Sequence, residues 1–262
     1  MVQYSADFAR RVAALCCAKF DDLPKSGKPQ PREWTVLAGV VQCIETSMSS
    51  RRVGTCMGEN SRGDVGCGNH DLHLSVVALG TGTKCLGDSK WCELGTRIHD
   101  SHAEVVAKRS FQRYLMDQAQ VQLSGQPSIF ETIISAHGPK LKLRKAITFH
   151  LYVSFTPCGD GSIFPQQCLD TNRTGAKCAP GEALDPKAPG SLYHRHGVLR
   201  TKPGRGPFSS SHCCSDKLFR WSVLGAQGCL LMGILQCPVY FESITFGACP
   251  FNYDAINRAL HT

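Results

Sequence analysis

The chain has 262 residues and a formal net charge of +8, and 42% of its residues are hydrophobic. This length allows one large domain with a sizeable core, and the lack of any apolar run of ~18 residues argues against a membrane-spanning helix. The positive charge suits a nucleic-acid partner without establishing one. The 15 cysteines lack the regular spacing of a disulfide framework, and no signal peptide accompanies them. We therefore expect an intracellular protein, cytoplasmic, nuclear or both, in which most of the thiols are free.

The first third of the chain predicts two helices and one strand. Apolar residues recur with a helical period over 4–20, and a Pro/Gly-rich turn over 23–31 separates this helix from a second one predicted over 33–44. Residues 50–70 are rich in Gly, Arg and Asn and predict a loop. Residues 73–79 predict a strand that ends at the turn GTGTK.

The middle of the chain predicts a helix, a buried strand and a long irregular segment. Residues 101–121 place apolar side chains on one helical face, and the β-branched and aromatic residues of 147–155 indicate a strand that stops at Thr156-Pro157. Residues 165–212 are rich in Pro, Gly and Ser and predict a long basic insertion. Such a segment is uncommon inside a compact domain unless it is functional.

The last part of the chain predicts a helix over 215–235, a strand over 238–246 and a short helix from about Asn252. Strands that alternate with helices indicate an α/β layered domain, and we expect one domain over residues 1–262. Residues 191–220 carry six Lys or Arg residues and one Asp, so they form either a solvated basic loop or a surface that contacts phosphates.

Three short segments carry metal-ligand chemistry. They are His102-Ala103-Glu104 at a predicted helix start, Pro157-Cys158 after the buried strand, and Cys213-Cys214 before another helix. One imidazole and two thiolates give zinc three protein ligands and leave a fourth position open for water. A glutamate two residues after the histidine is the acid/base, and not a ligand, in nucleobase deaminases. The pattern therefore predicts a catalytic zinc site with Glu104 moving the protons.

Each segment also has a plainer interpretation. Ser101 to Glu104 matches an S-x-x-E capping box, in which the glutamate satisfies a backbone donor. Cys158, Cys213 and Cys214 could be small buried hydrophobic residues. The P-C-x-x-C motif of cytidine deaminases is absent, so the second thiol must come from beyond the insertion.

The segments DSHAEVVAKRSFQRYL, TPCGDGSIFP and CCSDKLFRWSVLGAQGCLL closely resemble the deaminase domain of the RNA-editing adenosine deaminases. The segments GTGTKCLG, NRTGAKCAPGEA and VLRTKPGRG are more similar to the branch that acts on adenosine 37 of tRNA. The resemblance implies a cytidine-deaminase-like α/β/α domain with a mixed central sheet and zinc ligands at helix N-termini. It makes Cys214, directly before Ser-Asp-Lys, the ligand and Cys213 a bystander.

The resemblance also implies a reaction and a substrate. The reaction converts adenosine to inosine, and the expected substrate is position 37 of tRNA-Ala. The expected binding partner is therefore the anticodon loop of tRNA. Thr83 aligns with a residue of the nucleotide pocket, and Lys202 and Arg205 lie in a loop that reaches the RNA around the flipped base. Nothing in the sequence points to a membrane or to a protein partner.

A second cofactor follows from the resemblance, because the family buries inositol hexakisphosphate within its core. The positions that match its basic and polar shell are Lys84, Lys108, Arg109, Lys217, Arg220, Trp221 and Gln227. The plainer alternative for the cations on the two predicted helices is a solvated helix face. A buried cationic cluster would require a compensating anion.

The chain departs from the family in two places. His99 stands where the family has asparagine three residues before the metal histidine, which alters the link between metal shell and polyphosphate. The chain ends at Thr262, whereas family members continue, so we expect the C-terminal part of the family domain to be missing. Two alternatives to a deaminase of tRNA adenosine remain. One is a deaminase of double-stranded RNA, and the other is a truncated, non-catalytic form that binds RNA or zinc.

Overall fold

The computed structural model describes residues 4–26, 28–30, 32–46, 71–136, 138–164, 174–188, 192–202, 204, 206–247 and 249–261. Its centre is a four-stranded sheet with the strand order β10-β7-β1-β2. The strands are β1 (Leu37–Thr46), β2 (Asp71–Thr81), β7 (Ile147–Val153) and β10 (Ser243–Phe246). β1 is antiparallel to β2 and β7, whereas β10 is parallel to β7, so the sheet is mixed as expected.

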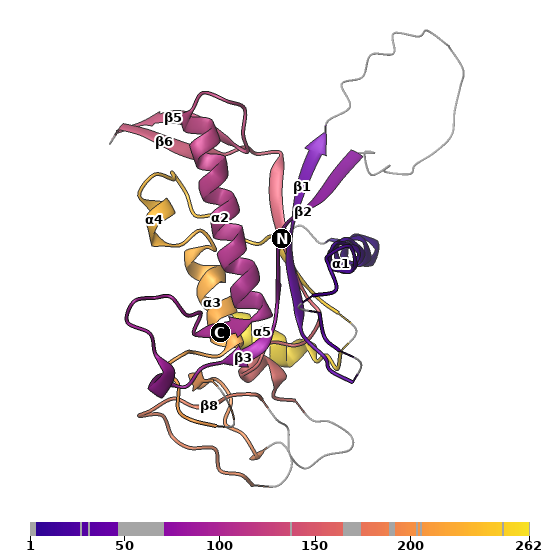
Figure 1. Cartoon of the computed structure of the whole chain (residues 1–262), viewed down its shortest axis with the longest axis vertical. Helices are drawn as coiled ribbons and strands as arrows, with labels where there is room; N and C mark the ends of the chain where they lie inside the picture. Colours follow the sequence, from indigo (N-terminus) through magenta and orange to yellow (C-terminus); the bar gives the residue numbers. More distant parts are fainter. Residues whose placement is uncertain are drawn as a thin grey trace, which may run out of the picture.

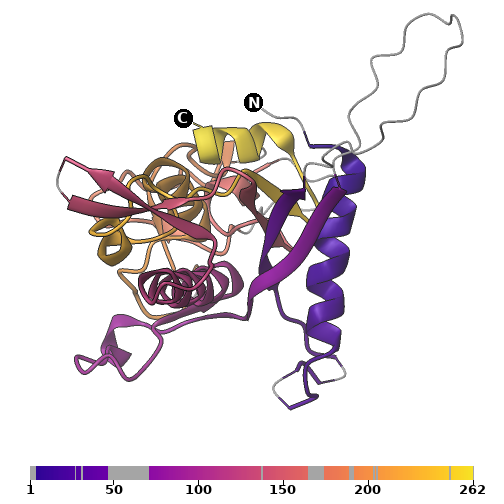
Figure 2. The same cartoon turned by 90° about the horizontal axis from the view of Figure 1, so that it is seen from above.

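Helices cover both faces of this sheet. α1 (Ala6–Asp21) lies on one face, and α2 (Ala103–Leu123) and α3 (Cys214–Leu224) lie on the other (Figures 1 and 2). Each face has its own cluster of buried apolar side chains. The predicted α/β/α layering is therefore confirmed.

Close packing of α2 on β2 positions the start of that helix. The buried face of α2 repeats every four residues and consists of Ala103, Ala107, Phe111, Leu115 and Ala119. Gly80 on β2 lies so close to this face that an added Cβ would lie 2.7 Å from the carbonyl oxygen of Ala103. Small residues on both elements thus bring the first turn of α2 against the sheet.

The prediction of a helix over 33–44 is wrong, because most of these residues form β1. The strand lies between β2 and β7, and seven consecutive residues from Leu37 to Cys43 are buried. A strand that is buried on both faces shows no alternation of apolar and polar residues, so its sequence is hard to distinguish from a buried helix. The sheet neighbours decide the outcome here.

The single helix predicted over 215–235 is also wrong, because it is two helices. α3 ends at Gly225, which has φ of 82°, and α4 (Cys229–Met232) begins after Gly228, which has φ of 80°. Both glycines adopt backbone conformations that break a right-handed helix. The strand predicted over 238–246 is confirmed only in its second half, as β10, because residues 238–242 are irregular. The final helix is confirmed as α5 (Tyr253–His261).

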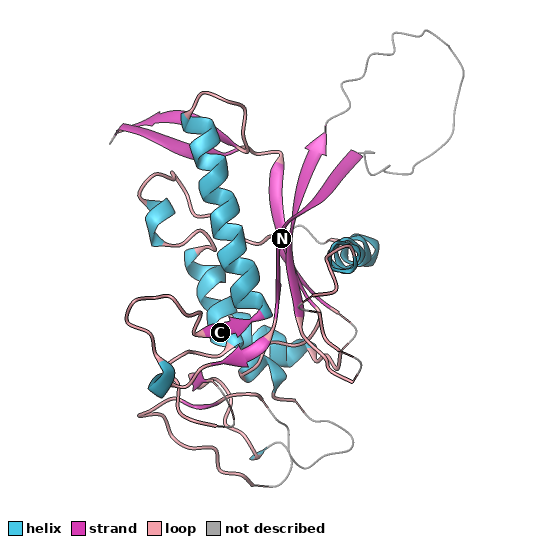
Figure 3. Cartoon of the chain, in the orientation of Figure 1, coloured by secondary structure: helices cyan, strands magenta, loops and turns pink. Residues whose placement is uncertain are grey.

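Several short elements were not predicted (Figure 3). They are the hairpin β5 (Phe130–Ser135) and β6 (Gly138–Leu143), the pair β3 (Thr83–Cys85) and β4 (Asp100–His102), the pair β8 (Lys177–Cys178) and β9 (Arg200–Thr201), and the single turns η1 (Asp88–Lys90) and η2 (Asp160–Ser162). The described part of the 165–212 segment is mostly irregular, as expected, whereas the loop predicted over 50–70 lies outside the described residues. Within the described ranges, no helix has the length and apolar character to cross a membrane.

Candidate metal centre

Three distant segments bring one imidazole and two thiols together. His102 is the last residue of β4 and the N-cap of α2, Cys158 follows β7, and Cys214 is the first residue of α3. Their ligand atoms all lie within 4.8 Å of one another. The three predicted zinc ligands therefore converge at the ends of helices α2 and α3.

The spacing of these atoms suits a tetrahedral metal. Nδ1 of His102 lies 3.6 Å from Sγ of Cys214 and 3.9 Å from Sγ of Cys158. Zinc bonds of about 2.3 Å to sulfur and about 2.0 Å to nitrogen, at tetrahedral angles, separate such atoms by about 3.6 Å. The donor types and the distances both fit Zn²⁺.

Backbone contacts hold the two thiol segments against each other. The Ser215 N–H donates to the Cys158 carbonyl at 3.0 Å, and the Cys214 N–H donates to the Cys158 sulfur at 3.3 Å. Gly159 has φ of 101°, and an added Cβ would clash with the Cys213 sulfur. This glycine lets the loop after β7 approach the start of α3 closely.

The two adjacent cysteines have different surroundings. Sγ of Cys213 donates to Oδ2 of Asp216 at 3.1 Å, away from the metal cluster, whereas Cys214 faces His102. A hydrogen bond from Cys214, together with His102, holds the pKa of the Cys158 thiol well below its usual value. Burial, together with the neighbouring Cys158, raises the pKa of the Cys214 thiol.

Glu104 lies on the first turn of α2, beside the metal cluster, and is 3% exposed. Burial raises the pKa of its carboxyl, and Oε2 has no hydrogen-bond partner among the described residues. The N-cap of α2 is His102 and not Ser101, so the capping-box alternative does not hold. A desolvated carboxyl with a free oxygen suits proton transfer.

A buried chain of charges that was not predicted supports Cys214. Nζ of Lys202 donates to Sγ of Cys214 at 3.1 Å and to both oxygens of Asp100, at 3.0 and 2.8 Å. Lys217 on α3 forms a second ion pair with Asp100. Asp100 lies two residues before His102 on β4, and this period of two, which places both on one face of a strand, is the signal that could have revealed it.

The role predicted for Lys202 is therefore corrected by its burial. The resemblance placed it among the residues that contact RNA, but its side chain is fully buried. Burial alone would lower its pKa, yet Cys214, Cys158 and Asp100 outweigh burial and raise it. Arg205, the other cation predicted there, lies outside the described residues. Thr83, the predicted pocket residue, pairs with His102 across β3 and β4 and is partly exposed.

A second cluster of cations lies between α2 and α3, away from the metal ligands. Burial and the neighbouring guanidinium groups of Arg220 and Arg109 lower the pKa of Lys108 to about 8. The Lys108 ammonium lies 5.8 Å from the ring centroid of Trp221. Among the described residues, no carboxylate forms an ion pair with Lys108, Arg109 or Arg220. Three of the cations predicted for the basic shell thus lie near one another with no carboxylate partner among the described residues.

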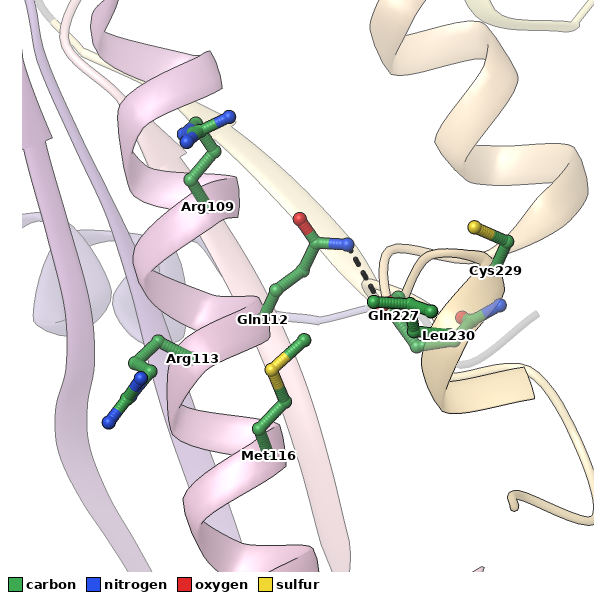
Figure 4. Close-up of a pocket in the computed structure, with 7 residues that line it drawn as sticks. All are labelled: Arg109, Gln112, Arg113, Met116, Gln227, Cys229 and Leu230. Atoms are coloured by element: carbon green, nitrogen blue, oxygen red, sulfur yellow. Dashed lines mark hydrogen bonds between the residues drawn. The ribbon is translucent and has the colours of Figure 1, made fainter. Parts of the chain in front are cut away.

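An open pocket of about 430 Å³ adjoins this cluster (Figure 4). The residues that line it are Arg109, Gln112, Arg113, Met116, Gln227, Cys229 and Leu230. Nε2 of Gln112 donates to the Gln227 carbonyl at 2.9 Å and ties α2 to the loop before α4. Two members of the predicted shell are placed differently: Lys217 is engaged with Asp100, and Lys84 is exposed on β3.

His99, which departs from the family pattern, is the last residue of the loop between β3 and β4. Its Nε2 is 3.8 Å from Oδ1 of Asp88, and its ring centroid is 5.2 Å from that of Trp91. The histidine thus joins a contact within this loop.

The layered fold, the His/Cys/Cys cluster and the buried glutamate define the class of nucleobase deaminases. Residues 78–262 match the adenosine-deaminase (editase) domain family. The chain is 33% identical over 351 residues to tRNA-specific adenosine deaminase 1 of Mus musculus, an alignment that covers 96% of this chain and 68% of the relative. The Drosophila melanogaster protein of that name is 35% identical over 271 residues, which cover 96% and 58%.

The double-stranded RNA-specific adenosine deaminase of Mus musculus is 35% identical over 208 residues, which cover 71% of this chain and 17% of that protein. The chain belongs to the adenosine-deaminase (editase) domain family. It is a hydrolytic deaminase by family, which agrees with the chemistry predicted from His102, Glu104, Cys158 and Cys214.

Proposed function

We propose that this protein is a zinc-dependent deaminase that converts adenosine to inosine in tRNA, at position 37 of tRNA-Ala. The observation that carries the proposal is the buried carboxylate of Glu104 beside the convergent His102, Cys158 and Cys214. The relatives aligned over 96% of this chain are named as tRNA-specific adenosine deaminases, which favours tRNA as the substrate.

The residues of the site divide the chemistry between them. Zinc held by the imidazole and the two sulfurs would act as a Lewis acid and would lower the pKa of water toward ~7. Glu104 accepts a proton from the attacking water and delivers it to N1 of the adenine. It then takes the proton of the hydroxyl newly added at C6 and delivers it to the amine, so that ammonia departs and C6 becomes the carbonyl carbon of inosine. The raised pKa of Glu104 suits a group that both accepts and donates protons near neutral pH.

An adenosine in a loop suits this site better than one in a duplex. The base must leave its stack to reach Glu104, which costs a few kcal/mol in a paired helix and less in a single-stranded loop. Thr83 pairs with His102 across β3 and β4 and is partly exposed, which supports the proposal that it contacts the nucleotide.

We also propose that a polyanion such as inositol hexakisphosphate occupies the cationic cluster between α2 and α3. Lys108, Arg109 and Arg220 lie close together without a carboxylate partner among the described residues, and such a cluster is unfavourable unless an anion compensates it. Denaturation of the purified protein, followed by mass spectrometry of the released small molecules, tests this independently of activity. A protein free of any polyphosphate would refute the assignment.

The alternative substrate is double-stranded RNA, which the names of other relatives favour. Inosine mapping on tRNA-Ala and on an RNA duplex, with zinc analysis of the same protein, separates the two. We expect conversion of the loop adenosine, and Glu104→Gln should retain zinc and lose activity at least ~100-fold. Glu131→Gln on β5, remote from the centre, is the matched control. Conversion of the duplex alone would replace the tRNA proposal, and wild-type protein without zinc would refute the metal site.

A further inference from the structure

Two segments form a rim beside the coordinating thiol of Cys158. The Gly159 N–H donates to the Thr174 carbonyl at 2.7 Å, and a Cβ added to Gly175 would lie 3.1 Å from the Cβ of Cys158. The Gly204 N–H in turn donates to the Gly175 carbonyl at 2.8 Å. Gly175 therefore borders the metal centre, and Gly204 lies against Gly175.

An aromatic ring and a cation from the two segments face each other on this rim. Nζ of Lys177 lies 6.0 Å from the ring centroid of Phe208 and donates to the Gly206 carbonyl at 3.4 Å. The Phe208 side chain is 42% exposed. The two segments therefore present a ring face and an ammonium group together.

The backbone under Phe208 is fixed although its ring is exposed. The Phe208 carbonyl accepts from the Asp88 N–H at 2.8 Å, and Oδ1 of Asp88 accepts from the Ser210 N–H at 3.0 Å. Ser209 between them is fully buried, and its Oγ lies 3.7 Å from the Cys85 sulfur. These contacts tie the segment to the loop after β3, so the backbone that carries the ring is held in place.

We propose that Phe208 and Lys177 bind an unstacked RNA nucleotide next to the adenosine that enters the metal centre. The base stacks on the exposed ring, and the ammonium group contacts its phosphate. Proteins that hold single-stranded RNA combine aromatic faces with cations in this way. The exposed Lys84 and Lys90 on the neighbouring segment add positive charge, and Asp88, the acid closest to Phe208 in the contacts above, is engaged with Ser210. The inference rests on the proposed function, because it assumes an RNA substrate.

The test measures binding and not turnover. Affinity for a short RNA hairpin with one adenosine in its loop is determined by fluorescence anisotropy in a Glu104→Gln background, over a range of salt concentrations. We expect Phe208→Leu to weaken binding about 5- to 100-fold and Phe208→Tyr to preserve it, because an aromatic face remains. Lys177→Gln should reduce the salt dependence by about one phosphate contact.

Two control variants have similar local surroundings far from the rim. Tyr240→Leu removes an aromatic ring that is 40% exposed and whose hydroxyl donates to the Val223 carbonyl, at the end of α3 opposite Cys214. Lys140→Gln removes an ammonium group that donates to the Gly233 carbonyl at 2.6 Å on β6. Both variants should bind the hairpin like the parent protein.

A hairpin with an abasic nucleotide beside the adenosine identifies the stacked base. If Phe208 holds that base, Phe208→Leu should weaken binding of the abasic hairpin less than twofold, because the two changes remove the same contact. Equal affinities of Phe208→Leu, Tyr240→Leu and the parent for the intact hairpin would overturn the inference. RNA bound through Phe208 by a protein that converts no tRNA adenosine would keep the inference and refute the proposed function. Failure of the parent to bind RNA would refute both.

Discussion

Nζ of Lys202 lies 3.1 Å from Sγ of Cys214 while it also contacts both carboxylate oxygens of Asp100. The ammonium group is fully buried, so it stabilises a thiolate that would otherwise be costly in a desolvated site. Through Asp100 the same lysine is connected to Lys217 on α3. Cys214, a proposed metal ligand, thus belongs to a network of charges from three separate segments.

Replacing Lys202 with methionine should destabilise both the fold and the metal site. The change leaves Asp100 and Cys214 buried with less compensating charge, and breaking a buried ion pair costs about 3–5 kcal/mol. We expect the midpoint of urea unfolding to fall and zinc to be lost at a lower chelator concentration. Lys140→Met on β6 is the control. Unchanged zinc retention in Lys202→Met would show that the lysine does not support the ligand.

Arg258 on α5 is predicted to position the loop that follows Cys158. Its Nε donates to Oδ2 of Asp160 at 2.8 Å, and its guanidinium also donates to the Ile163 carbonyl at 2.9 Å. Arg258→Met leaves the buried Asp160 without its cation, and we expect unfolding to become easier by about 2–3 kcal/mol. Arg258→Lys should restore part of this. Cobalt substitution provides a spectroscopic measure of ligand geometry, and an unchanged cobalt spectrum in Arg258→Met would contradict a positioning role.

Gly80→Ala should displace the start of α2. An added Cβ would lie 2.7 Å from the Ala103 carbonyl oxygen and would also clash with the Ala107 backbone, so the helix must move away from β2. Overpacking of this kind costs about 1–3 kcal/mol, and the shift should lower zinc affinity because His102 is the N-cap of α2. Gly125→Ala, which has open space around its Cβ but φ of 76°, controls for backbone strain without a clash. Equal zinc affinities in the two variants would contradict the prediction.

We expect the buried His150 on β7 to make the protein less stable in mild acid. The imidazole is fully buried between Thr148 and Ser243, at 3.0 and 2.9 Å, and burial lowers its pKa from 6.5 to about 4. Since the unfolded chain takes up this proton first, the contribution is fully present above pH 6.5 and is lost as the pH falls toward 4. Between these two pH values, the free energy of unfolding should fall by at most about 1.4 kcal/mol per pH unit because of this histidine.

Urea unfolding at several pH values tests this prediction. Carboxylates contribute to the pH dependence of every variant, so the informative quantity is the difference between wild type and His150→Gln. We expect a flatter profile between pH 6.5 and 4 for that variant, and no such change for His73→Gln, an exposed position on β2. Parallel profiles for wild type and His150→Gln would show that the imidazole does not titrate in this range.

Much of the metal site could be predicted because its residue types are chemically specific. An imidazole, two thiols and a glutamate two residues after the histidine are readable in the chain, and the structure brings the three ligands together. The charge chain was not readable, since Lys202 lies 102 residues from Asp100 and resembled a surface cation in a basic segment. Burial decides the role of a lysine, and burial is a property of the packed molecule.

The sequence by itself determined the amphipathic helices α1 and α2, the strand β7 and the residue types of the proposed metal site, because periodicity and side-chain chemistry are local. Only the tertiary structure decided that Leu37–Thr46 is a strand, since that depends on neighbours on both sides. The tertiary structure also showed that Cys214, and not the adjacent Cys213, faces His102. Cys214 and His102 lie 112 positions apart in the chain. Contacts over such distances form when layers pack, and no local pattern in the chain encodes them.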